Sequence, residues 1–214
     1  MAGGDQPVRK VCIVGGGTAG WMTGAVLSQW LSQVDVTLVE SDEIGIIGVG
    51  EATIPHIRNY LALAGIDPLK MISETKASFK LGIQFVNWGA EGESYIHGFG
   101  KIGRDMLWLH PHILWLAARE RAPGSVKHFD NYSLNCVACH QNKFAFPDKR
   151  NPNSPLADLD YAYHFDASLF ARFLRGESEA RGVTRVEGRI VEVIQHPASG
   201  FVKSVQLPDG RAIE

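Results

Sequence analysis

The alternation of apolar and polar positions over the first 40 residues predicts a strand, a helix and a second strand. A short apolar run, Val11–Val14, leads directly into a glycine-rich turn. A helix is expected to follow from Thr18 to about Gln33, because its apolar residues recur at helical spacing. The next apolar run, Val36–Val39, ends at Glu40. This order is typical of a βαβ unit with parallel strands.

The rest of the chain continues the mixture of helical and strand patterns. We expect an ordered loop over Ile44–Pro55, a helix from Pro55 to Gly65, a helix beginning at Pro68 with Asp67 as its cap, a helix near Ile113–Arg121, and a helix capped by Asp166 and running to Arg181. We expect strands over Phe79–Phe85, Val183–Val186, Ile190–Ile194, Phe201–Leu207 and Arg211–Ile213. These elements predict an α/β fold of Rossmann type, with an antiparallel β excursion near the end of the chain.

The region from Trp88 to about Asp160 differs in composition from the rest, being rich in His, Trp, Asn and Pro. We interpret residues 88–160 as an inserted helical and loop region that shapes the substrate side of a pocket. In folds of this kind the β excursion is followed by a strand that returns to the cofactor, and the sequence ends at Glu214 before such an element. We therefore expect residues 1–214 to be part of a longer cofactor-binding domain.

The glycine-rich turn carries the strongest chemical signal. Its residues are Gly15, Gly16, Gly17, Thr18, Ala19 and Gly20, which form a Gly-x-Gly-x-x-Gly pattern between strand and helix. Gly15 is expected to allow a tight turn, Gly17 a close approach of the backbone to a pyrophosphate, and Gly20 close packing of helix on strand. The helix N-terminus would face the phosphates, and Glu40 would accept hydrogen bonds from a ribose. Such turns bind both FAD and NAD, so the pattern predicts a dinucleotide without deciding which.

Composition and charge exclude several other classes of protein. The formal net charge of the 214 residues is -2, with pI ≈ 6.4, so there is no electrostatic case for binding nucleic acid or an anionic membrane. No secretory signal or membrane span is predicted, and the hydrophobic content of 45% is ample for a buried core. Three cysteines are too few for a disulfide framework, which favours the reducing cytoplasm.

The Cys136-x-x-Cys139-His140 pattern could indicate attachment of a c-type haem or half of a zinc site. Haem attachment generally accompanies export, and no second pair of zinc ligands follows at a usable spacing. We interpret the segment as a plain loop, and because the other histidines show no recognised metal spacing we predict no metal site.

Three segments together resemble the flavin-dependent tryptophan halogenases. They are Gly15–Met22, then Gly48–Pro55, which matches the strap between flavin and substrate sites in that family, and then Phe79-Lys80 leading to Phe85–Trp88. The similarity extends over essentially the whole chain, through His164–Ala167 and Arg181–Val183, and covers less than half of a complete family member.

The resemblance implies a function and a set of partners. In the family, reduced FAD from a separate flavin reductase, oxygen and chloride or bromide give hypohalous acid, which halogenates an indole or similar small aromatic substrate. Lys80 corresponds to the essential lysine that binds the hypohalous acid or becomes a haloamine. The resemblance further implies FAD contacts at Ser41, Val49, Ala52 and Ile190, and a homodimer. The catalytic glutamate and the halide site would lie beyond Glu214.

Several alternatives stay open at this stage. Lys80 could be an ordinary lysine on the solvent face of an amphipathic strand, since the alternation points it away from Phe79, Leu81, Ile83 and Phe85. The tryptophans Trp88, Trp108 and Trp115 could line an aromatic pocket, although core packing is the usual role of such residues. An aromatic flavin monooxygenase and a non-catalytic FAD-binding module are the rival functions.

Overall fold

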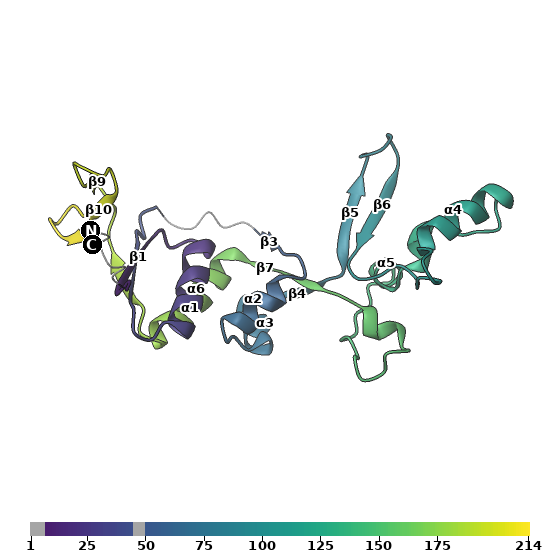
Figure 1. Cartoon of the computed structure of the whole chain (residues 1–214), viewed down its shortest axis with the longest axis horizontal. Coiled ribbons are helices and arrows are strands. Elements are labelled where there is room, and N and C mark those ends of the chain that lie inside the picture. The colour runs from purple at the N-terminus through teal and green to yellow at the C-terminus, as the bar shows by residue number, and fades with distance from the viewer. Residues whose placement is uncertain (1–6, 45–49) are drawn as a thin grey trace, which may run out of the picture. The chain divides into compact units, whose positions relative to one another are not determined.

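The computed structural model describes residues 7–44 and 50–214 of the chain (Figure 1). The chain divides into two compact units. The first unit consists of Met1–Glu51, Asn59–Ala77 and Phe165–Glu214, and the second of Ala52–Arg58 and Ser78–His164. The segment interpreted as an insertion, residues 88–160, lies wholly inside the second unit.

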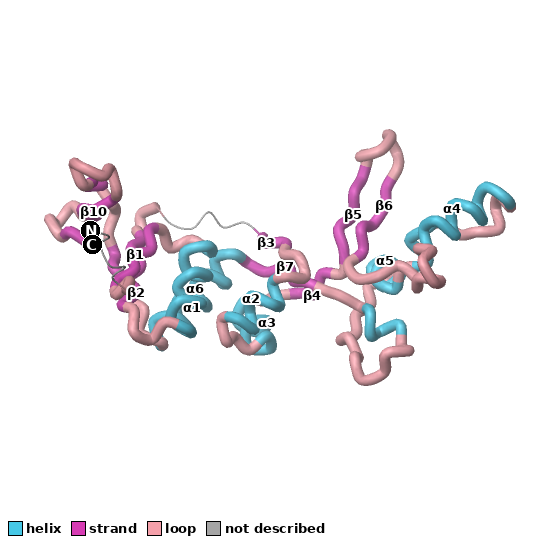
Figure 2. Tube along the Cα trace, in the orientation of Figure 1, coloured by secondary structure: helices cyan, strands magenta, loops and turns pink. Residues whose placement is uncertain are grey.

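A parallel sheet forms the centre of the first unit. Its strands are β1 (Lys10–Val14), β2 (Asp35–Glu40) and β8 (Thr184–Glu187), in the order β1-β2-β8. Two helices, α1 (Thr18–Trp30) and α6 (Ala167–Ala180), pack against each other beside this sheet (Figure 2). The predicted βαβ unit with parallel strands is confirmed.

The ends of the helices follow from local signals. The helix α1 ends at Trp30 instead of about Gln33, because Leu31 leaves the helical conformation while its N–H still bonds to the carbonyl oxygen of Leu27. The short helix α2 covers Ile57–Leu63. Asp67 caps α3 (Pro68–Thr75) by accepting a hydrogen bond from the N–H of Leu69. Asp166 caps α6 by accepting one from the N–H of Leu169. Both caps were predicted from the sequence.

The antiparallel excursion near the end of the chain is also confirmed. Its strands are β9 (Glu192–Gln195), β10 (Val202–Gln206) and β11 (Ala212–Ile213), in the order β11-β10-β9. The first of them begins two residues later than predicted, and Ile190 therefore lies in the connection between β8 and β9.

The prediction of one strand over Phe79–Phe85 is wrong. The segment forms β4 (Ser78–Lys80), which pairs with β7 (Ala162–Asp166), and β5 (Gly82–Val86), which pairs with β6 (Ser94–Gly98). The strands separate at Leu81, whose carbonyl oxygen accepts hydrogen bonds from the N–H of Phe99 and the side chain of Asn135. The alternating pattern continues across this break, which is why the sequence did not reveal it.

Two further loop predictions are corrected. Residues Gly50–Ala52, expected to be loop, form the strand β3 in a sheet of order β3-β7-β4. The cysteine segment forms the helix α5 (Leu134–His140), because the hydroxyl of Ser133 accepts a hydrogen bond from the N–H of Cys136 and caps it.

The helix α4 (Pro111–Arg121) lies where a helix was predicted. Short 3₁₀ turns cover Phe129–Tyr132 and Pro155–Asp158.

None of the helices in the described part of the chain is long and apolar enough to cross a membrane.

Candidate functional site

The glycine turn brings β1 and α1 into close contact. Gly15 has φ +106°, a conformation that side chains rarely adopt, and its N–H donates to the carbonyl oxygen of Val39 on β2 at 2.9 Å. A β-carbon at Gly20 would lie 1.9 Å from the carbonyl oxygen of Gly15, so only glycine allows the helix to start here. Gly15 and Gly20 thus have the turn and packing roles that the pattern predicts.

Gly16 and Gly17 have different reasons to be glycine. A β-carbon at Gly16 would lie 1.4 Å from Oε2 of Glu40, whose carboxylate covers this position. Gly17 precedes the first residue of α1 with φ -70° and ψ -179°, which any residue adopts, and no described atom lies within 4 Å of the place where its β-carbon would be. The backbone conformation and the described neighbours would therefore also allow a side chain at position 17. Because this residue is glycine, the space in front of the helix N-terminus stays open.

The carboxylate of Glu40 has three partners within the first unit. Oε1 accepts a hydrogen bond from Nε of Arg185 at 2.6 Å and lies 3.7 Å from Nη1 of Arg175. Oε2 accepts from the indole Nε1 of Trp21 at 3.3 Å. Arg185 also binds Asp42, so it links two carboxylates at the end of β2. The ribose contact predicted for Glu40 would be added to this network.

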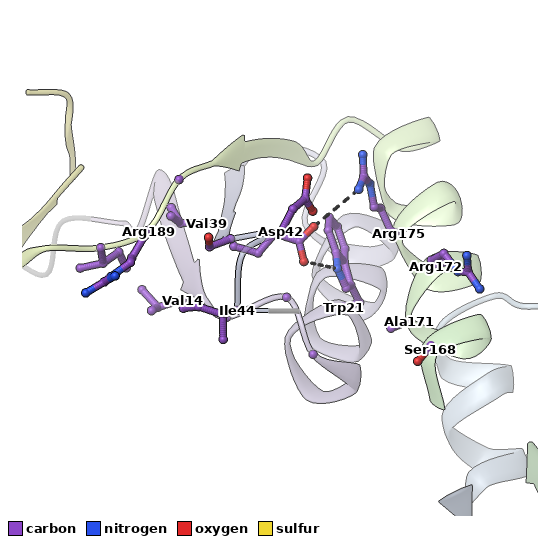
Figure 3. A pocket seen from close by; sticks show the side chains of 17 residues that line it. Val14, Trp21, Val39, Asp42, Ile44, Ser168, Ala171, Arg172, Arg175 and Arg189 are labelled. Carbon is purple, nitrogen blue, oxygen red and sulfur yellow. Dashed lines mark hydrogen bonds and ion pairs between the residues drawn. The ribbon is translucent and has the colours of Figure 1, made fainter. Parts of the chain in front are cut away.

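A pocket of about 640 Å³ opens beside the glycine turn (Figure 3). Its lining residues come from β1, β2, α1, α6 and the connection after β8: Val14, Gly15, Gly16, Gly17, Trp21, Val39, Glu40, Ser41, Asp42, Ile44, Ser168, Ala171, Arg172, Arg175, Gly188, Arg189 and Ile190. Figure 3 shows Trp21 and Arg175 pointing into the same region from α1 and α6. All of these residues belong to the first unit.

The structure brings together some of the predicted cofactor residues and not others. Gly15, Gly16, Gly17, Glu40, Ser41 and Ile190 line the pocket. Thr18, Ala19 and Gly20 form the first turn of α1 without lining it, and Ala52 lies in β3. Val49 falls outside the described residues.

Sequence reasoning missed the contribution of α6 and of Arg189. Arg172 and Arg175 lie one helical turn apart, which places them on one face of α6 toward the pocket. This spacing was the only signal in the sequence, and it does not reveal which distant element the face meets. The three arginines and the open N-terminus of α1 suit a ligand that carries phosphate groups. The residues present therefore fit a dinucleotide.

Lys80 in the second unit is a buried side chain that can carry a charge. It lies in β4 opposite Ala162 of β7, and only 6% of its surface is exposed. Its Nζ donates a hydrogen bond to the carbonyl oxygen of Thr53 at 2.9 Å and lies 5.5 Å from the centre of the Phe99 ring. No carboxylate of the described residues lies within 4.0 Å of the amine.

This burial excludes one of the two interpretations of Lys80. The alternative of an ordinary lysine on the solvent face is wrong, because the strand break at Leu81 gives β4 its own partner and its own environment. Burial without a counterion disfavours the ammonium form and lowers the pKa of the Lys80 amine. Buried lysines without a counterion are rare in proteins, which makes Lys80 a candidate functional residue.

The tryptophans differ from expectation. Core packing is the wrong interpretation for Trp88 and Trp108, whose exposed fractions are 74% and 79%. Trp115 is partly buried, and its indole N–H donates to the carbonyl oxygen of Lys127.

The three cysteines are free thiols. Cys136 is fully buried, with its sulfur 3.4 Å from the carbonyl oxygen of Ile96, and is therefore inaccessible to haem. In residues 7–44 and 50–214 no group of three or more His, Cys, Asp and Glu side chains is arranged to hold a metal ion.

Comparison with known proteins decides the family. The model of the tryptophan halogenase family matches residues 10–214. The chain belongs to the tryptophan halogenase family. The resemblance found in the three sequence segments is thereby confirmed.

The relatives of this halogenase chain include curated enzymes and solved structures. Tryptophan 7-halogenase RebH of Lentzea aerocolonigenes is 36% identical over 97% of this chain and 41% of its own length. The flavin-dependent halogenase Xcc4156 from Xanthomonas campestris is 45% identical with a TM-score of 0.88, over 98% of this chain and 41% of its own. BrvH, a flavin-dependent halogenase from Brevundimonas sp. BAL3, is 40% identical with a TM-score of 0.88 over the same shares.

Two facts follow from these likenesses. The halogenase chain has the Rossmann-type α/β fold of flavin-dependent halogenases, as predicted. It spans 41% of the length of the relatives named above.

Proposed function

We propose that the whole protein is an FAD-dependent halogenase that installs chloride or bromide on an indole or tryptophan-like aromatic substrate. The observation that carries this proposal is Lys80, a buried amine without a carboxylate partner, in a chain of the tryptophan halogenase family. A lysine with a purely structural role is uncommon in such a place, because burying an unpaired ammonium group is costly.

The pocket beside the glycine turn is the proposed FAD site. The open N–H groups of α1 would bind the pyrophosphate, and the space at Gly17 would admit it. Glu40, held by Arg185, would accept hydrogen bonds from the ribose, and Ser41 and Ile190 would border the cofactor. We propose that Thr18, Ala19, Gly20, Val49 and Ala52 also contact the cofactor. When bound, reduced FAD from a separate flavin reductase supplies the reducing power with which oxygen and halide yield hypohalous acid.

Lys80 would act on the hypohalous acid. A neutral amine can accept a halogen atom from HOX, giving a haloamine and water, whereas an ammonium group can only donate a hydrogen bond to it. The lowered pKa of Lys80 raises the fraction of neutral amine at a given pH and so favours formation of the haloamine at near-neutral pH. In both cases the amine directs the electrophilic halogen to the aromatic ring.

The remaining expectations belong to the same proposal. Flavin reductase, halide, oxygen and the aromatic substrate are the proposed partners, with a homodimer as the proposed assembly and the cytoplasm as the proposed location. The net charge of -2 supports neither nucleic acid nor an anionic membrane as a partner.

Halide dependence tests the proposed reaction. The full-length protein would be supplied with reduced FAD, oxygen, an indole and either bromide or chloride, and the products identified by mass spectrometry. We expect a halogenated indole that is absent without halide. A hydroxylated indole formed equally with and without halide would instead identify an aromatic flavin monooxygenase, and flavin binding without any product would identify a binding module.

A further inference from the structure

The position of the Lys80 amine depends on a single neutral acceptor. In the part of the chain that the structure describes, its hydrogen bond goes to the carbonyl oxygen of Thr53, at 2.9 Å. The donor and the acceptor both belong to the second unit. Since a lysine side chain has four rotatable bonds, the amine stays in place only as long as this carbonyl oxygen does.

Thr53 is attached to the sheet by three hydrogen bonds to one residue, Tyr163 of β7. The N–H of Thr53 donates to the carbonyl oxygen of Tyr163 at 3.0 Å, and the hydroxyl of Thr53 donates to the same oxygen at 2.8 Å. The hydroxyl also accepts from the N–H of Tyr163 at 3.0 Å. The side chain thus supplies a donor and an acceptor immediately after β3 ends at Ala52.

These contacts link the amine back to its own strand, β4, and so form a closed circuit of contacts. Tyr163 lies opposite Phe79 in the antiparallel pairing of β7 with β4, and Phe79 is the residue directly before Lys80. The chain of contacts therefore runs from the amine to Thr53, from Thr53 to Tyr163, and back along β4 to Lys80. A change in the Thr53 hydroxyl alters one side of the circuit while leaving β4 intact.

We propose that Thr53 is a positioning residue for Lys80: its carbonyl oxygen holds the amine, and its hydroxyl, bound to Tyr163, holds the carbonyl oxygen. The inference rests on the proposed function, in which the Lys80 amine must meet hypohalous acid at a defined place. Because the hydroxyl of Thr53 donates and accepts at once, serine can replace threonine here, and valine and alanine cannot.

Competitive labelling of amines measures the position of Lys80 without any halogenation. The full-length protein and its Thr53→Val and Thr53→Ser variants would be acetylated over a range of pH, and the Lys80 peptide quantified by mass spectrometry. We expect Thr53→Val to raise the limiting labelling rate of Lys80 at least about threefold, because the released amine leaves its buried place more often. Thr53→Ser should label as the unchanged protein does.

Halogenation kinetics provide the second measurement. We expect Thr53→Val to lower kcat at least about tenfold with little change in KM for the indole, because the amine is misplaced while the substrate site is not altered. Thr53→Ser should restore kcat. Thr75→Val is the matched control, since it removes another buried hydroxyl, which donates to the carbonyl oxygen of Met71 at 2.7 Å, and should change neither Lys80 labelling nor kcat.

The outcomes separate this inference from the proposed function. Labelling of Lys80 in Thr53→Val equal to that of the unchanged protein would overturn the inference, and so would a Thr53→Ser variant that behaves like Thr53→Val. Absence of halide-dependent product from the unchanged full-length protein would overturn the proposed function while leaving the labelling result to decide whether Thr53 holds the amine. If Thr53→Val does not fold, Thr53→Ala removes the hydroxyl with a smaller change in packing and decides in its place.

Discussion

Glu40 and Arg185 are joined by a hydrogen bond of 2.6 Å between Nε and Oε1, although 145 positions separate them in the chain. Both side chains are largely buried, and Arg185 also binds the carboxylates of Asp42 and Glu187. One guanidinium group therefore binds three carboxylates at the ends of β2 and β8, beside the pocket proposed for FAD.

We expect Arg185→Met to destabilise the protein and to weaken FAD binding. Removing Arg185 takes away the nearest counterion of carboxylates that lie close together and leaves Glu40 with Arg175 at 3.7 Å, which should lower the free energy of unfolding by about 2–3 kcal/mol. Urea unfolding measures this. The matched control is Arg211→Met, which breaks an exposed ion pair with Asp209 and should cost no more than about 1 kcal/mol. Equal losses in the two variants would contradict the central role of Arg185.

Gly17→Ala should weaken FAD binding without destabilising the fold. The new methyl group would enter the open space in front of α1, where the pyrophosphate is proposed to bind, and we expect at least about a tenfold rise in Kd, or 1.4 kcal/mol. Titration of flavin fluorescence measures the affinity. Gly176→Ala is the control, because its β-carbon would also meet no described atom but lies on α6, away from the pocket lining. An unchanged Kd for Gly17→Ala would refute the placement of the pyrophosphate.

Lys80→Met should abolish halogenated product while leaving FAD affinity intact. Methionine keeps most of the stem volume and removes the amine, so packing is largely preserved. Lys80 does not line the pocket proposed for FAD, and its loss should therefore not change flavin binding. Product would be followed by mass spectrometry and affinity by flavin fluorescence. Lys203→Met, at an exposed position of β10, should halogenate normally. Near-normal halogenation by Lys80→Met would show that the amine has no role in the reaction.

The same substitution should stabilise the fold in a pH-dependent way. The folded protein holds the pKa of Lys80 below the ordinary lysine value of 10.5, so between the two values the unfolded chain binds more protons than the folded one. Lys80 therefore lowers the free energy of unfolding at neutral pH. This destabilising contribution becomes smaller as pH rises through the window between the two pKa values. We expect Lys80→Met to be more stable than the unchanged protein at pH 7 and the difference to shrink toward pH 10, as measured by urea unfolding. A difference that grows with pH would contradict the lowered pKa.

Local features of the first unit could be predicted from the sequence. The glycine turn, the caps at Asp67 and Asp166 and the order of strand and helix follow from interactions between residues a few positions apart. The same holds for the antiparallel strands, whose turns are short. The sequence therefore determined the Rossmann-type fold class, the dinucleotide pattern and the location of Lys80 on a strand.

Other features depended on pairing between distant segments. The break at Leu81 arises because β4 and β5 have different partners, and an alternating pattern carries no information about which strand lies alongside. The arginines of α6 reach the pocket only because α6 packs against α1. Cys136 is a buried residue of the helix α5, which Ser133 caps, whereas we had interpreted the cysteine segment as a loop.

Lys80 shows most clearly which properties the sequence alone does not determine. Its spacing identified a candidate amine on a strand and left the solvent face as an alternative. The tertiary structure buried the amine, because β7 lies beside β4 and Thr53 provides the acceptor, and both come from segments distant in the chain. Periodicity determines which side of a strand a residue occupies, whereas the desolvation that lowers the pKa of an amine depends on what the rest of the chain places on that side.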